Sequence, residues 1–195
     1  MEIRTKSAKE TENIARKLAL EAVRAKNQTS ALVIALSGAL GAGKTTFAQG
    51  FAQTLGIKER VLSPTFVLMK IYEIQKRARP RHFVHIDCYR IRSARDIIPL
   101  GVKEIFKDTK AIVLIEWPER IRGLIPRNAL WIRLKHGEKE NERILSFTPS
   151  LKFRQPQSVP SGIGKHSVLE SSVFPPALPG RQKNQSKFSV GFTQK

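Results

Sequence analysis

The residues most able to do chemistry in this chain lie in a glycine-rich stretch between residues 37 and 46. It reads Ser-Gly-Ala-Leu-Gly-Ala-Gly-Lys-Thr-Thr, so that Gly43, Lys44 and Thr45 follow Gly38 at a fixed spacing. Glycines allow positive φ angles, which let the backbone N–H groups turn inward around an anion. Lys44 can then reach the β- and γ-phosphates of a nucleotide, and the Thr45 hydroxyl can bind Mg²⁺. This is the complete P-loop pattern.

An acidic residue at the end of a second apolar run fits the same chemistry. Five apolar residues, 111–115, precede Glu116, Trp117 and Pro118. The run predicts a buried parallel strand, and ligands of α/β sheets bind at the carboxyl ends of such strands. The Glu116 carboxylate therefore has the place of a Walker B acid, which approaches Mg²⁺ or polarises the attacking water. Trp117 either covers this site or simply packs.

A third polar group follows the sequence His-Phe-Val-His-Ile-Asp at residues 82–87. Alternation along a strand places His85 and Asp87 on one face. The sequence shows no further Cys or His cluster for zinc, and Mg²⁺ prefers oxygen ligands. We expect Asp87 to lie near the Mg²⁺-nucleotide, where it orients either the water or the metal shell, and His85 to position it. The alternative for His85 is a half-buried strand histidine, and Cys88 reads as a packing residue.

Thr65 is the candidate for a residue that senses the γ-phosphate. It lies in Ser63-Pro64-Thr65, on the connection that follows the predicted P-loop helix, where nucleotide-dependent switches place such a residue. The alternative is a Ser-Pro turn that leads into a strand over 67–74.

Hydrophobic periodicity predicts the strands and helices that carry these groups. Residues 32–36 form a continuous apolar run typical of a buried strand, and Phe47, Phe51 and Leu55 recur at helical spacing over 44–55. An edge strand over 2–6, a helix that begins with a Ser7–Glu10 capping box, a short helix near 106 and a hairpin formed by 128–135 and 142–148 complete the pattern. The fold class predicted is α/β, a mainly parallel P-loop NTPase-type sheet flanked by helices, with additional antiparallel strands.

The composition of the chain bears on its cellular location and its partners. The 195 residues carry a formal charge of +19, and the single cysteine allows no intramolecular disulfide. We expect a cytoplasmic protein, since the sequence shows no signal peptide and no apolar run long enough for a membrane span. The basic charge favours an anionic partner such as nucleic acid, or serves solubility. Residues 1–148 are predicted to form one domain, and the proline- and serine-rich residues 149–195 a basic, disordered tail.

Together these segments resemble the TsaE family, the small bacterial ATPases of tRNA threonylcarbamoyladenosine biosynthesis. The resemblance covers about residues 1–148 and is carried, in this order and spacing, by residues 36–46, 63–66, 85–90 and 116–117. It implies an ATP- and Mg²⁺-dependent protein that hydrolyses ATP in association with the TsaB and TsaD proteins. That cycle supports the modification of adenosine 37 in tRNAs that read codons beginning with A, while TsaD carries the transferase chemistry. Contact with tRNA would be indirect or through the basic surface.

The resemblance also implies a role for each site residue. The implied catalytic residues are Lys44, Asp87 and Glu116, and the implied metal ligands are Thr45 and Glu116. The residues implied to bind the nucleotide are Gly41, Ala42, Gly43, Lys44, Thr45, Thr46, Thr65 and Trp117.

Two other functions stay open from the residues alone. A small-molecule kinase shares the P-loop and the acid, and Arg90, Arg92 and Arg95 could serve its lid. A nucleotide-gated assembly factor would need binding but negligible turnover. A GTPase is less favoured, because the sequence has no Asn-Lys-x-Asp element to read guanine.

Overall fold

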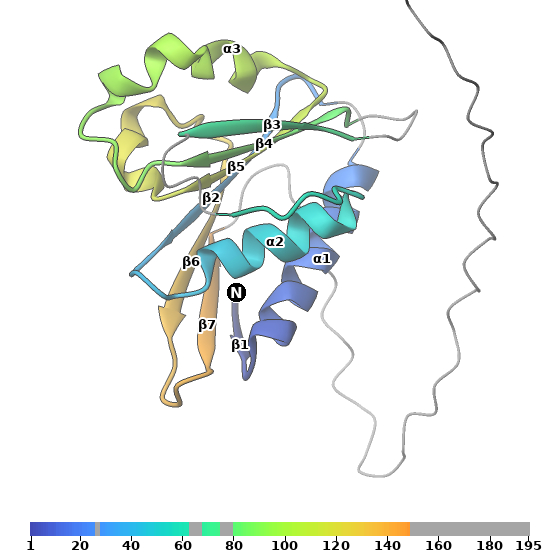
Figure 1. Ribbon diagram of the computed structural model, residues 1–195, viewed down its shortest axis with the longest axis vertical. Coiled ribbons are helices and arrows are strands. Elements are labelled where there is room, and N and C mark those ends of the chain that lie inside the picture. Colours follow the sequence, from blue (N-terminus) through green and yellow to red (C-terminus); the bar gives the residue numbers. More distant parts are fainter. Residues whose placement is uncertain (26–27, 63–67, 75–79, 149–195) are drawn as a thin grey trace, which may run out of the picture. The chain divides into compact units, whose positions relative to one another are not determined.

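A seven-stranded mixed sheet organises the described part of the chain, which in this computed structural model comprises residues 1–25, 28–62, 68–74 and 80–148. The strand order is β1-β7-β6-β2-β5-β4-β3 (Figure 1). The strands are β1 (Glu2–Thr5), β2 (Leu32–Gly38), β3 (Met69–Glu73), β4 (His82–Asp87), β5 (Ala111–Glu116), β6 (Leu130–His136) and β7 (Arg143–Thr148). The helices are α1 (Ala8–Arg24), α2 (Lys44–Thr54) and α3 (Val102–Lys107), with 3₁₀ turns η1 (Ala94–Asp96), η2 (Ile98–Leu100) and η3 (Pro118–Leu124).

The four central strands, β6, β2, β5 and β4, run parallel, and antiparallel strands extend the sheet on both sides. This confirms the predicted fold class. The two innermost strands, β2 and β5, read as continuous apolar runs because both of their faces are covered. Their carboxyl ends meet at one edge of the sheet, where Glu116 is in register with Leu36 of β2 on one side and with Asp87 of β4 on the other.

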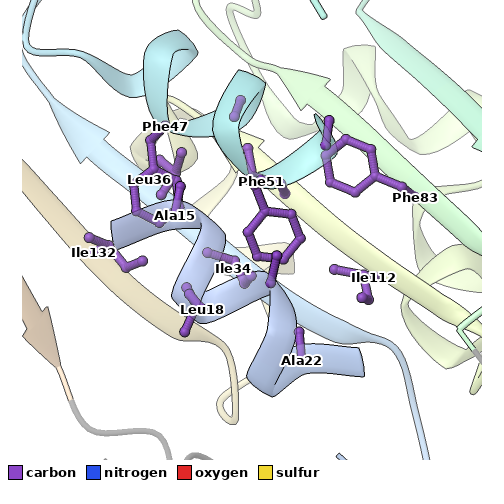
Figure 2. Packing of buried hydrophobic residues seen from close by; sticks show 14 of the residues in the cluster. Ala15, Leu18, Ala22, Ile34, Leu36, Phe47, Phe51, Phe83, Ile112 and Ile132 are labelled. Atoms are coloured by element: carbon purple, nitrogen blue, oxygen red, sulfur yellow. The ribbon is translucent and has the colours of Figure 1, made fainter. Parts of the chain in front are cut away.

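Two hydrophobic cores lie on opposite faces of the sheet. On one face, α1 and α2 pack side by side over Ile34, Leu36 and Ile112, and Phe51 of α2 stacks on Phe83 of β4 (Figure 2). The other face packs against α3 and the 3₁₀ turns, with residues such as Val33 and Val113 inside. Adjacent residues of one strand thus serve different cores, as the period of two requires.

The two helices on the first face approach each other closely. A Cβ at Gly50 of α2 would lie 2.7 Å from the Cα atom of Glu12 in α1, so only glycine allows this separation.

At the start of α1, the Ser7 hydroxyl accepts from the Glu10 N–H as expected, but the Glu10 carboxylate accepts from the Lys6 N–H instead of the Ser7 N–H. The predicted capping box is therefore only half formed.

Some predictions fall outside the described residues. These are the switch residue Thr65 and the tail 149–195, which stay predictions. Within the described residues, no helix is long and apolar enough to cross a membrane.

Candidate functional site

The glycine-rich loop joins β2 to α2 through backbone that favours glycine. Gly38 ends β2 with a φ of 141°, and a Cβ there would overlap the carbonyl oxygen of Leu134 on β6. Gly41 and Gly43 have φ angles of 72° and 95°. Between them, Ala42 is buried and donates its N–H to the carbonyl of Ala39 at 3.2 Å. The loop therefore turns back sharply and places the N-terminus of α2 at the carboxyl edge of the sheet.

Lys44, the first residue of α2, folds its side chain back into this loop. Its Nζ donates to the carbonyl oxygens of Gly38 at 2.9 Å and Ala39 at 2.8 Å, and lies 3.9 Å from the centre of the Trp117 ring. The pKa of Lys44 is lowered, first because burial disfavours the charged ammonium. The carboxylates of Glu116, Asp87 and Glu119 act in the opposite direction. The Lys44 side chain is thus almost completely shielded from water and lies against the carbonyl groups of the glycine-rich loop.

A chain of three side chains connects α2 to β5 and β4. The Thr45 hydroxyl donates to Glu116 Oε2 at 2.9 Å, and Glu116 Oε1 lies 3.0 Å from His85 Nε2. Glu116 and His85 are 2% and 0% exposed, so this carboxylate depends on these partners for its solvation. The arrangement leaves one carboxylate oxygen beside the Thr45 hydroxyl and occupies the other with the imidazole.

Asp87 stands beside this chain but takes no hydrogen bond from His85. It is buried at the end of β4, in register with Glu116, and its Oδ1 accepts from the Tyr89 N–H at 2.9 Å. The expectation that His85 positions Asp87 is therefore wrong, because the histidine contacts the acid of the neighbouring strand. Asp87 is held by the turn that follows its own strand.

Trp117 has an unusual backbone for a tryptophan. Its φ of 57° and ψ of 48° lie in the left-handed region, which is costly for a bulky residue and is found mainly where a side chain must be aimed. The turn directs the indole over Lys44, where it also contacts the Tyr89 ring at 5.1 Å between ring centroids. Trp117 therefore covers the lysine and also packs against the core on the α3 face of the sheet, so the two arrangements considered from the sequence do not exclude each other.

Comparisons with known proteins bear on this geometry. Residues 5–145 match the profile of the family described as threonylcarbamoyl adenosine biosynthesis protein TsaE. The chain belongs to the TsaE family. It is 38% identical to the TsaE protein of Treponema pallidum over 103 residues, which are 53% of this chain and 72% of that protein. It is 39% identical to the TsaE protein of Bacillus subtilis over 116 residues, 60% of this chain and 68% of that protein.

A solved structure agrees with this family assignment. The crystal structure of YdiB from Bacillus subtilis superimposes with a TM-score of 0.56 at 32% identity, covering 75% of this chain and 83% of YdiB. The TsaE-family match spans the P-loop, β4 and β5, so it includes every described residue that the sequence predicts for the site. Thr46 lies half-buried in the first turn of α2, beside the other predicted loop residues.

Two contacts of this TsaE-family chain are not predicted from its sequence. His136 and Arg143, on either side of the β6–β7 turn, rest on the loop: His136 Nε2 lies 3.2 Å from the Leu40 carbonyl oxygen, and Arg143 Nη2 donates to that of Gly41 at 3.2 Å. No motif marks either residue. Their role depends on the strand order, which places the hairpin directly beside β2.

A cleft of about 590 Å³ also opens beside the loop. Aromatic and charged side chains line it together with the end of β2, and Arg122 lies 5.2 Å from the centre of the Trp131 ring. The lining residues are Ser37, Gly38, Ala39, Trp117, Glu119, Arg122, Trp131, Arg133 and Thr148. Since Trp117 also covers Lys44, the cleft adjoins the lysine end of the loop.

Proposed function

We propose that this chain binds ATP with Mg²⁺, hydrolyses it, and serves the formation of threonylcarbamoyladenosine in tRNA together with the TsaB and TsaD proteins. Family membership supports the pathway. The observation that carries the chemistry is the 2.9 Å contact between the Thr45 hydroxyl and Glu116 Oε2. It joins the first turn of the P-loop helix to the acid at the end of the neighbouring parallel strand, where phosphoryl-transfer sites place their metal ligands.

The residues at this contact have the donor chemistry that Mg²⁺ requires. Thr45 and Glu116 offer oxygen atoms, the ligands of a hard cation. No group of three or more His, Cys, Asp or Glu side chains able to hold a metal ion occurs in the described ranges, which fits an ion held partly by phosphate oxygens and water. Thr45 and Glu116 would hold the ion, and when bound it would neutralise charge on the phosphates.

The other groups have separate tasks in this proposal. Lys44 exchanges its two carbonyl partners for phosphate oxygens and stabilises charge on the transferred group, an effect strengthened by its burial. Asp87, in register with Glu116 on the adjacent strand, would orient either the attacking water or the metal shell. Trp117 keeps bulk water from the lysine.

The cleft beside Trp117 favours a second candidate, a small-molecule kinase. Its volume of about 590 Å³ is sufficient for a small acceptor, and Arg122 and Arg133 line it. The arginines considered from the sequence for a lid, Arg90, Arg92 and Arg95, do not line this cleft.

Release of inorganic phosphate from ATP tests the proposal and separates the two candidates. We expect release that requires Mg²⁺, is unaffected by small acceptors and changes when TsaB and TsaD are added. Lys44→Ala is expected to slow it by about 100-fold or more, because a preorganised donor to the transition state is lost. Lys135→Ala, which removes an exposed lysine of β6, is the charge-matched control and should not alter it. ATP consumption that depends on a small acceptor, with the phosphate recovered on it, would establish the kinase instead.

A further inference from the structure

The buried histidine of β4 has a role that neither the motif nor the family match assigns. His85 is 0% exposed, and its ring contacts a polar atom through one nitrogen only: Nε2 lies 3.0 Å from Glu116 Oε1. Its other ring nitrogen, Nδ1, is buried and has no hydrogen-bond partner among the described residues. The Phe83 ring lies nearly parallel to the imidazole, at a centroid distance of 6.5 Å.

These contacts select one tautomer of the ring. A carboxylate can only accept hydrogen bonds, so the nitrogen that faces Glu116 must carry the proton. A proton on Nδ1 as well would bury a donor without an acceptor, which is more costly than burying an unpaired lone pair on a neutral ring. The structure therefore assigns His85 as the neutral imidazole that donates from Nε2 to Glu116.

We propose that His85 is a positioning residue for Glu116 and thereby for the bound divalent cation. By occupying Oε1, the imidazole fixes the plane of the carboxylate and leaves Oε2 as the oxygen that faces Thr45. Groups that orient a metal-binding side chain in this way typically change metal affinity or activity by about 10- to 100-fold when removed. This inference rests on the proposed function, because it concerns the acid that would hold the metal.

The sheet explains why the histidine can reach the acid of the next strand. Phe83, His85 and Asp87 alternate along β4, and Ile112, Leu114 and Glu116 alternate along β5. Phe83, Ile112 and Leu114 belong to the core under α2. The two series end in Asp87 and Glu116, and Glu116 contacts Thr45 in the first turn of that helix. With Asp87 in register with Glu116, His85 lies one pair earlier on the same face and contacts Glu116 diagonally.

Two conservative variants test this role. In His85→Gln the amide nitrogen sits at about the reach of Nε2, whereas in His85→Asn it sits at the reach of Nδ1, which faces no acceptor. We would load wild type and both variants with a non-hydrolysable ATP analogue and titrate Mn²⁺, with free Mn²⁺ followed by electron paramagnetic resonance. Analogue affinity without metal and thermal unfolding would be measured in parallel. Phe83→Leu is the packing control, since it removes the stacked ring but leaves the donor.

We expect His85→Asn to lower Mn²⁺ affinity about tenfold or more. His85→Gln should retain most of the affinity, and metal-free analogue binding should stay unchanged in both. Phe83→Leu should lower thermal stability without a comparable loss of Mn²⁺ affinity. Equal Mn²⁺ affinity in wild type and both variants would overturn the inference, and so would an equal loss in both. Wild type that binds neither the analogue nor Mn²⁺ would instead contradict the proposed function.

Discussion

The carboxyl edge of the parallel strands and the antiparallel β1–β7–β6 side of the sheet both carry charged residues. The two regions differ in how far these side chains are exposed to water. At the parallel edge Lys44, Asp87 and Glu116 are 4%, 4% and 2% exposed. On the antiparallel side the Arg4 side chain is 49% exposed and lies 3.7 Å from Glu138, which is 83% exposed. Charged side chains are thus buried together at the parallel edge, whereas on the antiparallel side Arg4 and Glu138 stay in water and Glu142, at 6% exposed, is the buried member of the group.

The difference in burial marks the parallel edge as the candidate functional region. Burying a charge is unfavourable unless other polar groups replace its water, so a fold that buries several together usually does so for chemistry. Exposed pairs contribute little because water screens them. Substitutions at the buried edge should therefore change stability or activity strongly, and substitutions on the antiparallel side should change them only weakly.

The largest structural effect is expected from Gly38→Ala at the buried edge. The new Cβ would overlap the Leu134 carbonyl at a φ of 141°, so we expect a loss of about 3 kcal/mol in the free energy of unfolding. Gly56→Ala is the matched control, because Gly56 also has a positive φ, 84°, but nothing lies within 4 Å of the new Cβ. Urea unfolding of both variants measures the difference. Equal losses would show that the close contact with β6 is unimportant.

A smaller effect is expected from the single cysteine, which follows β4 at the same edge. Burial raises the pKa of the Cys88 thiol from 9.0 to about 12. Between these values the unfolded chain has released this proton and the folded chain has not, so stability falls as pH rises. Relative to Cys88→Ala, wild type should lose up to about 1.4 kcal/mol per pH unit above pH 9.

Thiol chemistry provides a second measurement of the same burial. Iodoacetamide at pH 8 should modify Cys88 only after the protein has been unfolded in urea, because the native thiol is both buried and protonated. Rapid modification of the native protein, or a stability difference from Cys88→Ala that does not vary with pH, would contradict this account of the edge.

The smallest effect is expected on the antiparallel side. Arg4→Ala removes the contact with exposed Glu138 at 3.7 Å and the contact with buried Glu142 at 3.8 Å. The Glu142 carboxylate keeps its hydrogen bond from the Lys139 N–H, so the free energy of unfolding should fall by no more than about 1 kcal/mol. Phosphate release should be unchanged. If Arg4→Ala lowered the free energy of unfolding as much as Gly38→Ala does, the two regions would not differ in their sensitivity to substitution.

The elements of the site were predictable because each has a local signal. The spacing of Gly38, Gly43 and Lys44 identifies the loop, and five apolar residues before Glu116 identify the strand and the acid at its end. The fold class follows from the same runs. Alternation also placed His85 and Asp87 correctly on one face of β4.

Contacts between elements were not predictable in the same way. The partner of His85 depends on the register of β4 against β5, and the contacts of His136 and Arg143 with the loop depend on β6 lying next to β2. Strand order and register are set by the packing of the whole sheet, which leaves no mark within a short segment. Thr65 stays a prediction, since it lies outside the described residues.

Phosphate release by Glu116→Gln tests whether the Glu116 carboxylate supports hydrolysis at this edge of the sheet. Glutamine keeps the size of the side chain, and its amide oxygen can still accept from His85 while its NH2 group donates to the Thr45 hydroxyl, but it removes the negative charge. We predict that the variant folds, binds the ATP analogue without metal as wild type does, and releases phosphate at least about 100-fold more slowly in Mg²⁺. Wild-type release rates in this variant would contradict the assignment of Glu116, and with it the hydrolytic site proposed at this edge of the sheet.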